Sequence, residues 1–370
     1  MKFIHLSDLH IGKTVNNFPM IPEQKNAFRQ ILEYVRTTGP QAVVIAGDVY
    51  DRAIPSVEAV QVFDDFITAL AAENIAVLLI SGNHDSPERL GFGSRLLASS
   101  NIHFYGAFDG TMAKVTLCDN VHFWLLPFIK PSLVKGFFQV EVETYDQAVS
   151  AAIAASDVDY TACNVLVSHQ FYAKSGTNPI KSDSELNPVG GLDAVDASII
   201  ENFDYVALGH LHANQHVGDK HIRYCGSPIK YSFSEVNHKK SITLVEIEGK
   251  GNVTTTQLPI TPLHDMRKLK GNISQLIEPQ GNPEDYLHIT LTDNQEIIDP
   301  MGKLRSVYPN IMELDFDNYR TTSQIETTPN KEAIKNPYEL FQQFFLETQG
   351  STMTEEQGKF ICQLLEGDAE

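Results

Sequence analysis

Residues 75–85, IAVLLISGNHD, join a buried strand to a polar loop in one continuous stretch. The apolar run is short and unbroken, which is typical of a strand buried on both faces of its sheet. The next residues, 82–85, are a glycine, an amide, an imidazole and a carboxylate. Such a group at a strand end indicates a functional site rather than a simple turn, and other strand ends must complete it.

Residues 1–260 alternate strand and helix patterns, which predicts an α/β layered core. Buried strands are expected at KFIHLS (2–7), QAVVIAG (41–47), VHFWLLPF (121–128), CNVLVS (163–168) and DYVALG (204–209). Helical spacing of apolar residues is found at 22–37, at 56–73 after a Ser N-cap, and near 144–156. After residue 212 the period changes to two, so IRYCGSP (222–228), SITLVEIEG (241–249) and NVTTTQLPI (252–260) are expected to be antiparallel strands.

The last third of the chain has a different organisation. Residues 261–316 mix helix and strand patterns and predict a small α+β capping domain. Residues 317–335 are polar and without periodicity, which is typical of a linker. Residues 336–370 hold two short amphipathic helices whose apolar faces need a surface to cover, either their own domain or a partner protein.

Polar residues of similar type follow five of the predicted strands. They are Asp8 and His10, Asp48, Asn83 and His84, His169, and His210 and His212. In layered α/β folds, sites form just beyond the carboxyl ends of strands, so these side chains are expected to meet. Each motif alone is more often a turn, but five in series at strand ends are not a coincidence.

The chemistry of this set indicates a centre for divalent metal ions. Asp and neutral His are ligands for Mn, Fe or Zn, and no thiolate pair competes for the role. Two ions can clamp the attacking and departing oxygens of a phosphoryl transfer. Seven candidate ligands suffice for two ions: Asp8, His10, Asp48, Asn83, His169, His210 and His212. His84 is then left as a general acid or a donor to the transition state.

Composition excludes several other classes of protein. The chain has 370 residues and four scattered cysteines, which argues against a disulfide framework and fits a reducing cytoplasm. No apolar run is long enough to cross a membrane, and the N-terminus lacks the pattern of a signal peptide. GKT at 12–14 lacks the upstream glycine of a phosphate loop, because that position is Ser7.

The net charge of −19 argues against non-specific binding of nucleic acid and is an objection to any DNA substrate.

The series DxH, GDxxD, GNHD, a lone His after a strand, and GHxH resembles the calcineurin-like metallophosphoesterase family over residues 1–225. The resemblance implies a β-sandwich flanked by helices, with a dinuclear centre. It assigns Asp8, His10 and His212 to the first metal ion, and Asn83, His169 and His210 to the second. It makes Asp48 the bridging ligand and His84 the catalytic histidine. Asp51 matches a residue that orients that histidine, and Arg52 is a possible phosphate contact.

The stretches IHLSDLHIGK, VVIAGDVYDRAIPS, LLISGNHDSPERLGFG and YCGSPIKYSFSE look more narrowly like the SbcD family of bacterial nuclease subunits. That resemblance spans the chain and implies 3′→5′ double-strand exonuclease and hairpin endonuclease activity with Mn²⁺. It also implies a homodimer, DNA as substrate, roles in DNA repair, recombination and replication, and an SbcC-like SMC-type ATPase gripped by the C-terminal helices.

Two alternatives stay open at this point. A stand-alone phosphodiesterase on small nucleotides would share the metal centre, although it has no use for the residues after 260. A non-catalytic scaffold would keep the fold without the chemistry, although each ligand position here holds a competent residue. Seven basic residues are candidate contacts for a phosphate backbone: Lys13, Arg52, Arg89, Arg95, Lys174, Lys181 and Lys230.

Overall fold

The computed structural model describes residues 1–118, 120–138, 141–174, 179–185, 194–317 and 337–367. The chain divides into two compact units, Met1–Met266 and Arg267–Glu370, and each is described by itself. The predicted linker, 317–335, lies outside the described residues except for Asp317.

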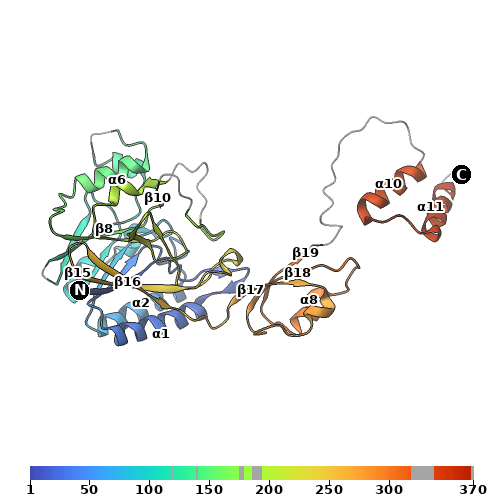
Figure 1. Ribbon diagram of the computed structural model, residues 1–370, viewed down its shortest axis with the longest axis horizontal. Helices are drawn as coiled ribbons and strands as arrows, with labels where there is room; N and C mark the ends of the chain where they lie inside the picture. Colours follow the sequence, from blue (N-terminus) through green and yellow to red (C-terminus); the bar gives the residue numbers. More distant parts are fainter. Residues whose placement is uncertain (119, 139–140, 175–178, 186–193, 318–336, 368–370) are drawn as a thin grey trace. The chain divides into compact units, whose positions relative to one another are not determined.

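The described part of the first unit contains two six-stranded sheets (Figure 1). One sheet has the order β16 (Asn252–Pro259), β15 (Ser241–Gly249), β1 (Lys2–Leu6), β4 (Ala42–Ala46), β5 (Ala76–Ile80), β6 (Ile102–Tyr105). The other has the order β13 (Gln215–Val217), β14 (Asp219–Tyr224), β12 (Tyr205–Leu208), β9 (Cys163–Ser168), β8 (Val121–Leu126), β7 (Ala113–Leu117). Strands β1, β4, β5 and β6 are parallel neighbours, and so are β8, β9, β12 and β14.

The two sheets pack face to face through apolar side chains. The ring of Phe3 in β1 meets the ring of Phe123 in β8 edge-on, with centroids 5.2 Å apart, and that of Tyr205 in β12 at 5.7 Å. Alternate residues of the strands form the buried layer between the sheets, because successive side chains point to opposite faces. This is the β-sandwich that the sequence predicts, so the predicted fold class is confirmed.

Helices cover the outer faces of the sandwich (Figure 1). The long helices α1 (Ile21–Thr38) and α2 (Val57–Ala72) lie on one side, where Phe28 stacks on Phe66. Helix α6 (Tyr145–Ala154) lies on the other and buries Ala148, Val149 and Ala152. The predicted N-cap of α2 forms, because Ser56 accepts from the N–H of Ala59, and Thr144 makes a capping box at the start of α6.

Shorter elements complete this unit. They are β2 (Thr14–Val15), β3 (Phe18–Pro19), α3 (Pro87–Leu90), α4 (Ser94–Leu97), η1 (Ala98–Ser100), α5 (Pro131–Lys135), β10 (Tyr172–Ala173), β11 (Val195–Asp196), η2 (Ala197–Ile200) and η3 (Phe233–Glu235).

One expectation about strand direction is wrong in part. The alternating pattern predicts an antiparallel arrangement for β14, but residues 222–224 pair in parallel with β12, and only β13 runs antiparallel to β14. Alternation shows that one face of a strand is buried, but it does not identify the neighbour. The strands β15 and β16 are antiparallel, as expected.

The second unit begins with a small α+β fold. Its sheet has the order β17 (Met266–Gly271), β18 (Tyr286–Leu291), β19 (Ile311–Phe316), and α7 (Ile273–Leu276) and α8 (Pro300–Arg305) contribute Leu276 and Leu304 to its core. The two C-terminal helices are α10 (Pro337–Gln349) and α11 (Glu355–Gly367), and Thr354 and Gln357 cap the second reciprocally. Within the described residues, no helix has the length and apolar character needed to cross a membrane.

Candidate metal centre

The seven candidate ligands lie beyond the carboxyl ends of β1, β4, β5, β9 and β12, so both sheets contribute. Four of them have a left-handed backbone: φ is 54° at Asp8, 41° at His10, 50° at Asp48 and 104° at His210. Such angles are uncommon for residues with a side chain and cluster at functional sites, where the surroundings hold them in place. Strand ends that turn this sharply bring their side chains back toward one point.

A glycine makes one close approach between these loops possible. A Cβ atom on Gly82 would lie 2.1 Å from Oδ1 of Asp48 and 2.4 Å from its backbone nitrogen. Only a residue without a side chain lets the loop after β5 pass so near the loop after β4. Gly82 therefore sets the spacing between Asn83 and Asp48.

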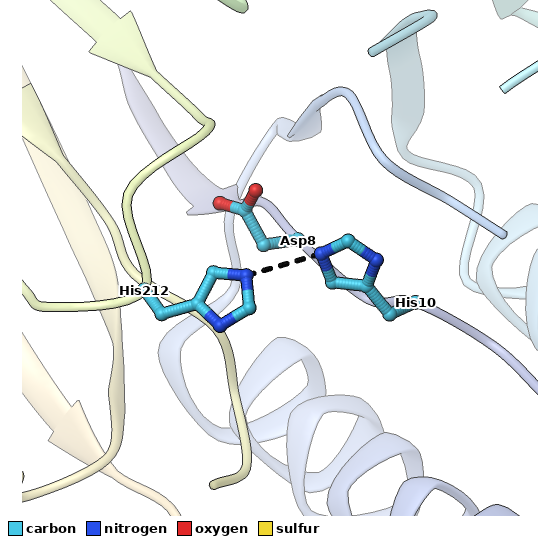
Figure 2. Close-up of side chains that lie close together, drawn as sticks. All are labelled: Asp8, His10 and His212. Carbon is cyan, nitrogen blue, oxygen red and sulfur yellow. Dashed lines mark hydrogen bonds between the residues drawn. The ribbon is translucent and has the colours of Figure 1, made fainter. Parts of the chain in front are cut away.

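Asp8, His10 and His212, which we call the first site, form one cluster (Figure 2). The Nε2 atoms of the two histidines face each other at 3.1 Å, and the carboxylate of Asp8 lies beside them. All three side chains are buried, and their ligand atoms lie within 4.8 Å of one another. Two imidazole nitrogens and a carboxylate converging in this way form a donor set for a divalent ion.

Asn83, His169 and His210, which we call the second site, converge as well. Oδ1 of Asn83 lies 3.1 Å from Nε2 of His169 and 3.1 Å from Nδ1 of His210. Nδ1 of His169 is 2.7 Å from the carbonyl oxygen of Ala46, to which it donates. That bond fixes the tautomer and leaves Nε2 of His169 free to bind a metal ion.

Asp48 lies between the two sites. Its Oδ2 is 3.7 Å from Nε2 of His10 and 3.2 Å from Nε2 of His169. Its Oδ1 accepts the backbone N–H of His84 at 2.9 Å. One carboxylate oxygen within reach of a histidine from each site has the position that a bridging ligand requires.

Charge supports the interpretation of these groups as metal ligands. Burial alone would lower the pKa of His169, but the Asp48 carboxylate raises it to about 9. Burial lowers the pKa of His210 to about 3, and that of His10 well below its ordinary value. Burial raises the pKa of Asp8. The neutral imidazoles of His10 and His210 beside buried carboxylates fit divalent cations, because such ions bind deprotonated ligands, and His169 would lose its proton on binding.

His84 lies at the edge of the first site. Its ring centroid is 4.7 Å from that of His10, and its Nδ1 is 2.9 Å from the backbone carbonyl oxygen of Asp51. The main chain of Asp51 therefore orients His84. The carboxylate of Asp51 instead accepts from Nζ of Lys13 at 2.7 Å and lies 3.9 Å from Nδ1 of His10.

The basic candidates differ in their surroundings. The side chain of Arg52 is 82% exposed and lies 3.6 Å from the Asp51 carboxylate. Nζ of Lys181 lies 4.1 Å from the ring centroid of Phe171, which neighbours His210. Lys230 is paired with Asp265 at 2.7 Å. Lys13 and Arg52 thus lie beside Asp51 near the first site, and Lys181 lies beside Phe171 near the second.

Three residues near the centre have roles that the sequence pattern does not predict. Gln24 donates to the carbonyl oxygens of Leu9 and His10 and accepts the N–H of Gly12, so it holds the loop after β1. Tyr231 packs edge-on against His10. The third is Asp85, the last residue of SGNHD. A buried Gln in an amphipathic helix is a signal that could have identified Gln24.

Asp85 ties two loops of the centre together. Its carboxylate accepts the backbone N–H groups of Val49 at 3.1 Å, Tyr50 at 3.0 Å and Gly82 at 2.9 Å. Burial and the charge of Asp48 raise its pKa to about 6. It is therefore a structural carboxylate that holds the loops after β4 and β5 together.

Comparison with known proteins gives two matching family models. Residues 1–214 match the calcineurin-like phosphoesterase family, and residues 262–349 match the family described as the type 5 capsule protein repressor C-terminal domain. The SbcD subunit of the SbcCD nuclease of Staphylococcus epidermidis is 34% identical over 337 residues, which cover 88% of this chain and 89% of that protein.

Solved structures are similar at lower identity. A dimetal phosphatase from Danio rerio is 13% identical with a TM-score of 0.41, over 70% of this chain and 99% of that one. The phosphoesterase Yfce from E. coli is 14% identical with a TM-score of 0.30, over 70% and 100%. The sequence matches carry the assignment: the chain belongs to the calcineurin-like phosphoesterase family and, within it, to the family of the SbcD nucleases.

Proposed function

We propose that this protein is a dinuclear metal-dependent DNA nuclease, a 3′→5′ double-strand exonuclease and hairpin endonuclease active in repair and recombination. Its family makes it a metal-dependent phosphodiester hydrolase. The step from hydrolase to DNA nuclease rests on one observation, the 34% identity to an SbcD nuclease along nearly the whole chain.

The residues of the two sites would hold the ions, which we propose to be Mn²⁺. Asp8, His10 and His212 would bind one ion, Asn83, His169 and His210 would bind the other, and Asp48 would contribute to both. Bound there, the ions supply Lewis acidity and charge for in-line displacement at phosphorus. All donors are oxygen and imidazole nitrogen, a set that suits Mn²⁺ as well as Zn²⁺ or Fe²⁺.

His84 would serve the departing sugar oxygen. The bond from its Nδ1 to the Asp51 carbonyl oxygen fixes the ring and leaves Nε2 as the atom that faces substrate. A protonated imidazole can give that proton to the oxygen as the phosphorus–oxygen bond breaks. Arg52 and Lys13, beside the same loop, would contact non-bridging or flanking phosphate oxygens.

The acidic balance of the chain needs an explanation for a DNA enzyme. The net charge is −19, but the centre itself contains only the buried carboxylates Asp8 and Asp48 among its ligands. Two divalent ions would reverse the sign of the field at the centre, where the scissile phosphate binds. A partner ATPase would supply basic surface further along the duplex.

Exposed apolar side chains support the proposed assembly. Leu340 and Phe344 of α10 are 55% and 58% exposed, and Phe360 and Leu364 of α11 are 61% and 53% exposed. We propose that these helices bind an SbcC-like SMC-type ATPase and that residues 261–316 are the small α+β domain that the sequence predicts. The four free cysteines fit a reducing cytoplasm.

Exposed apolar side chains of the first unit support a homodimer. Val57 at the start of α2 is 88% exposed, and Phe92 and Leu96 around α4 are 87% and 80% exposed. Large apolar side chains exposed to this extent are typical of protein interfaces. We propose that they form the contact between two copies of the chain.

The test is DNA cleavage by the protein co-purified with its ATPase, on a hairpin substrate with Mn²⁺, with and without ATP. Wild type should cut the hairpin faster than it hydrolyses a cyclic nucleotide, and chelation of the metal should stop both reactions. His84→Ala should retain its metal and lose about 10²–10⁴-fold in turnover. A preference for the cyclic nucleotide would favour the small-substrate phosphodiesterase, and full activity of His84→Ala would contradict the assigned role.

A further inference from the structure

A buried polar network lies behind His212, on the side of the ring away from the first site. Oγ of Ser184 is 2.8 Å from Nδ1 of His212 and 2.6 Å from Oε1 of Glu235. Oε1 of Glu235 is itself 3.4 Å from Nδ1 of His212. The hydroxyl therefore connects the ring to the carboxylate, accepting from Nδ1–H and donating to Glu235.

The carboxylate at the end of this network is charged and fixed. Glu235 is fully buried, and Nζ of Lys240 lies 2.5 Å from its Oε2. A buried ion pair with its desolvation cost adds little net stability, so its presence here is better explained by what it holds.

The backbone of His212 is held by the same group of residues. Glu185 accepts its N–H at 2.7 Å, and Lys240 donates to its carbonyl oxygen at 2.9 Å. Neither residue touches the ring. The ring orientation thus depends on Ser184 and Glu235, and the main-chain position depends on Glu185 and Lys240.

We propose that Glu235, acting through the hydroxyl of Ser184, is a positioning residue that keeps the proton of His212 on Nδ1. Nε2, which faces Nε2 of His10 at 3.1 Å, is then the nitrogen presented to the metal ion of the first site. Histidine ligands of metal ions characteristically donate their other N–H to such a partner, and loss of the partner weakens metal binding. The inference rests on the dinuclear centre of the proposed function and adds the residues that support one half of it.

The structure offers a matched pair of variants. Ser184→Ala removes the hydroxyl that joins His212 to Glu235. Ser232→Ala removes another half-buried hydroxyl, 3.3 Å from the same Oε1 of Glu235, that makes no contact with His212. Ser184→Thr keeps a hydroxyl at the first position and serves as the conservative variant.

The experiment is calorimetric titration of the full-length metal-free variants with Mn²⁺, without DNA. Ser184→Ala should weaken one of the two binding steps about 10–100-fold and leave the other unchanged, because only the first site contains His212. Ser232→Ala and Ser184→Thr should bind both ions as wild type does. The unfolding temperature of metal-free Ser184→Ala should match that of Ser232→Ala, which separates positioning from a purely structural role.

Equal Mn²⁺ affinities of Ser184→Ala and wild type would overturn the proposal, as would an equal loss in Ser232→Ala. A loss from both steps together with a lower unfolding temperature would also overturn it, since that pattern means general damage. The double variant Glu235→Gln with Lys240→Met removes the ion pair without leaving one charge buried alone, and it should show the same selective loss. Because DNA is absent from the titration, a failure to cut DNA would count against the proposed function alone.

Discussion

Replacing Gln24 by leucine should damage the loop that carries His10 far more than its position in a helix suggests. Gln24 is 1% exposed, and its amide donates to the carbonyl oxygen of His10 at 2.7 Å and accepts the N–H of Gly12 at 3.1 Å. Leucine has a similar volume and no polar atoms. The N–H of Gly12 would then lose its partner. The carbonyl oxygen of His10 would keep only the N–H of Lys13, at 3.0 Å, and the carbonyl oxygen of Leu9 would keep the hydroxyl of Tyr231.

The expected size follows from those two groups. A donor left without a partner costs about 1–3 kcal/mol, and the hydrogen bond lost at the His10 carbonyl oxygen costs about 1 kcal/mol, so the total is about 2–4 kcal/mol. For a unit of this size that is a fall of roughly 4–16 °C in unfolding temperature. The left-handed backbone of His10, at φ 41°, should also relax and weaken metal binding at the first site.

The assay is thermal unfolding of the metal-free protein, followed by calorimetric titration with Mn²⁺. Gln30→Leu is the control, since Gln30 lies on the same helix and makes its contacts, to Asn26 and Thr261, away from the centre. If Gln24→Leu unfolds within a degree or two of Gln30→Leu and binds metal normally, Gln24 does not hold the loop after β1.

Three further outcomes are expected. Asp51→Ala should lose much less turnover than His84→Ala, because the contact to His84 comes from the main chain; equal losses in DNA cleavage would show that the carboxylate itself matters. Mn²⁺ binding at pH 7.5 should release a proton from His169, whose pKa of about 9 keeps it protonated in the metal-free protein. The Mn²⁺ affinity should therefore rise as the pH increases toward 9. Calorimetric titrations in buffers of different ionisation heat measure the number of protons released, and a value of zero would refute the prediction. Phe92→Glu combined with Leu96→Glu should convert a dimer to monomers in sedimentation, whereas Ile298→Glu, at an equally exposed position of the second unit, should not; an unchanged dimer would place the interface elsewhere.

The strand and helix patterns are sufficient to predict an α/β layered core and to select the side chains that meet at its edge, and the family resemblance adds the sandwich. The reason is local: each candidate ligand follows a strand directly, and neighbouring parallel strands end at one edge. The spacing of motifs such as SDLH and GHLH therefore carries three-dimensional information. The same locality explains the correct cap at Ser56, which depends on a contact three residues away.

The supporting residues could not be predicted because their contacts join distant parts of the chain. Ser184 lies 28 residues from His212 and 51 from Glu235, and nothing in the local pattern pairs them. The parallel pairing of β14 with β12 depends on a neighbouring strand in the same way. The contact of His84 with the main chain of Asp51 is a further case, because the sequence gives the identity of residue 51 but not the direction in which its carbonyl group points.

The number of Mn²⁺ ions bound per chain at equilibrium tests the central claim most directly. We predict two ions for the wild-type protein, measured by metal analysis after dialysis against excess Mn²⁺. We also predict loss of bound metal in Asp48→Ala, because the oxygen that lies between His10 and His169 is removed. A folded wild-type protein that binds one ion or none, or an Asp48→Ala variant that retains two, would contradict the dinuclear centre.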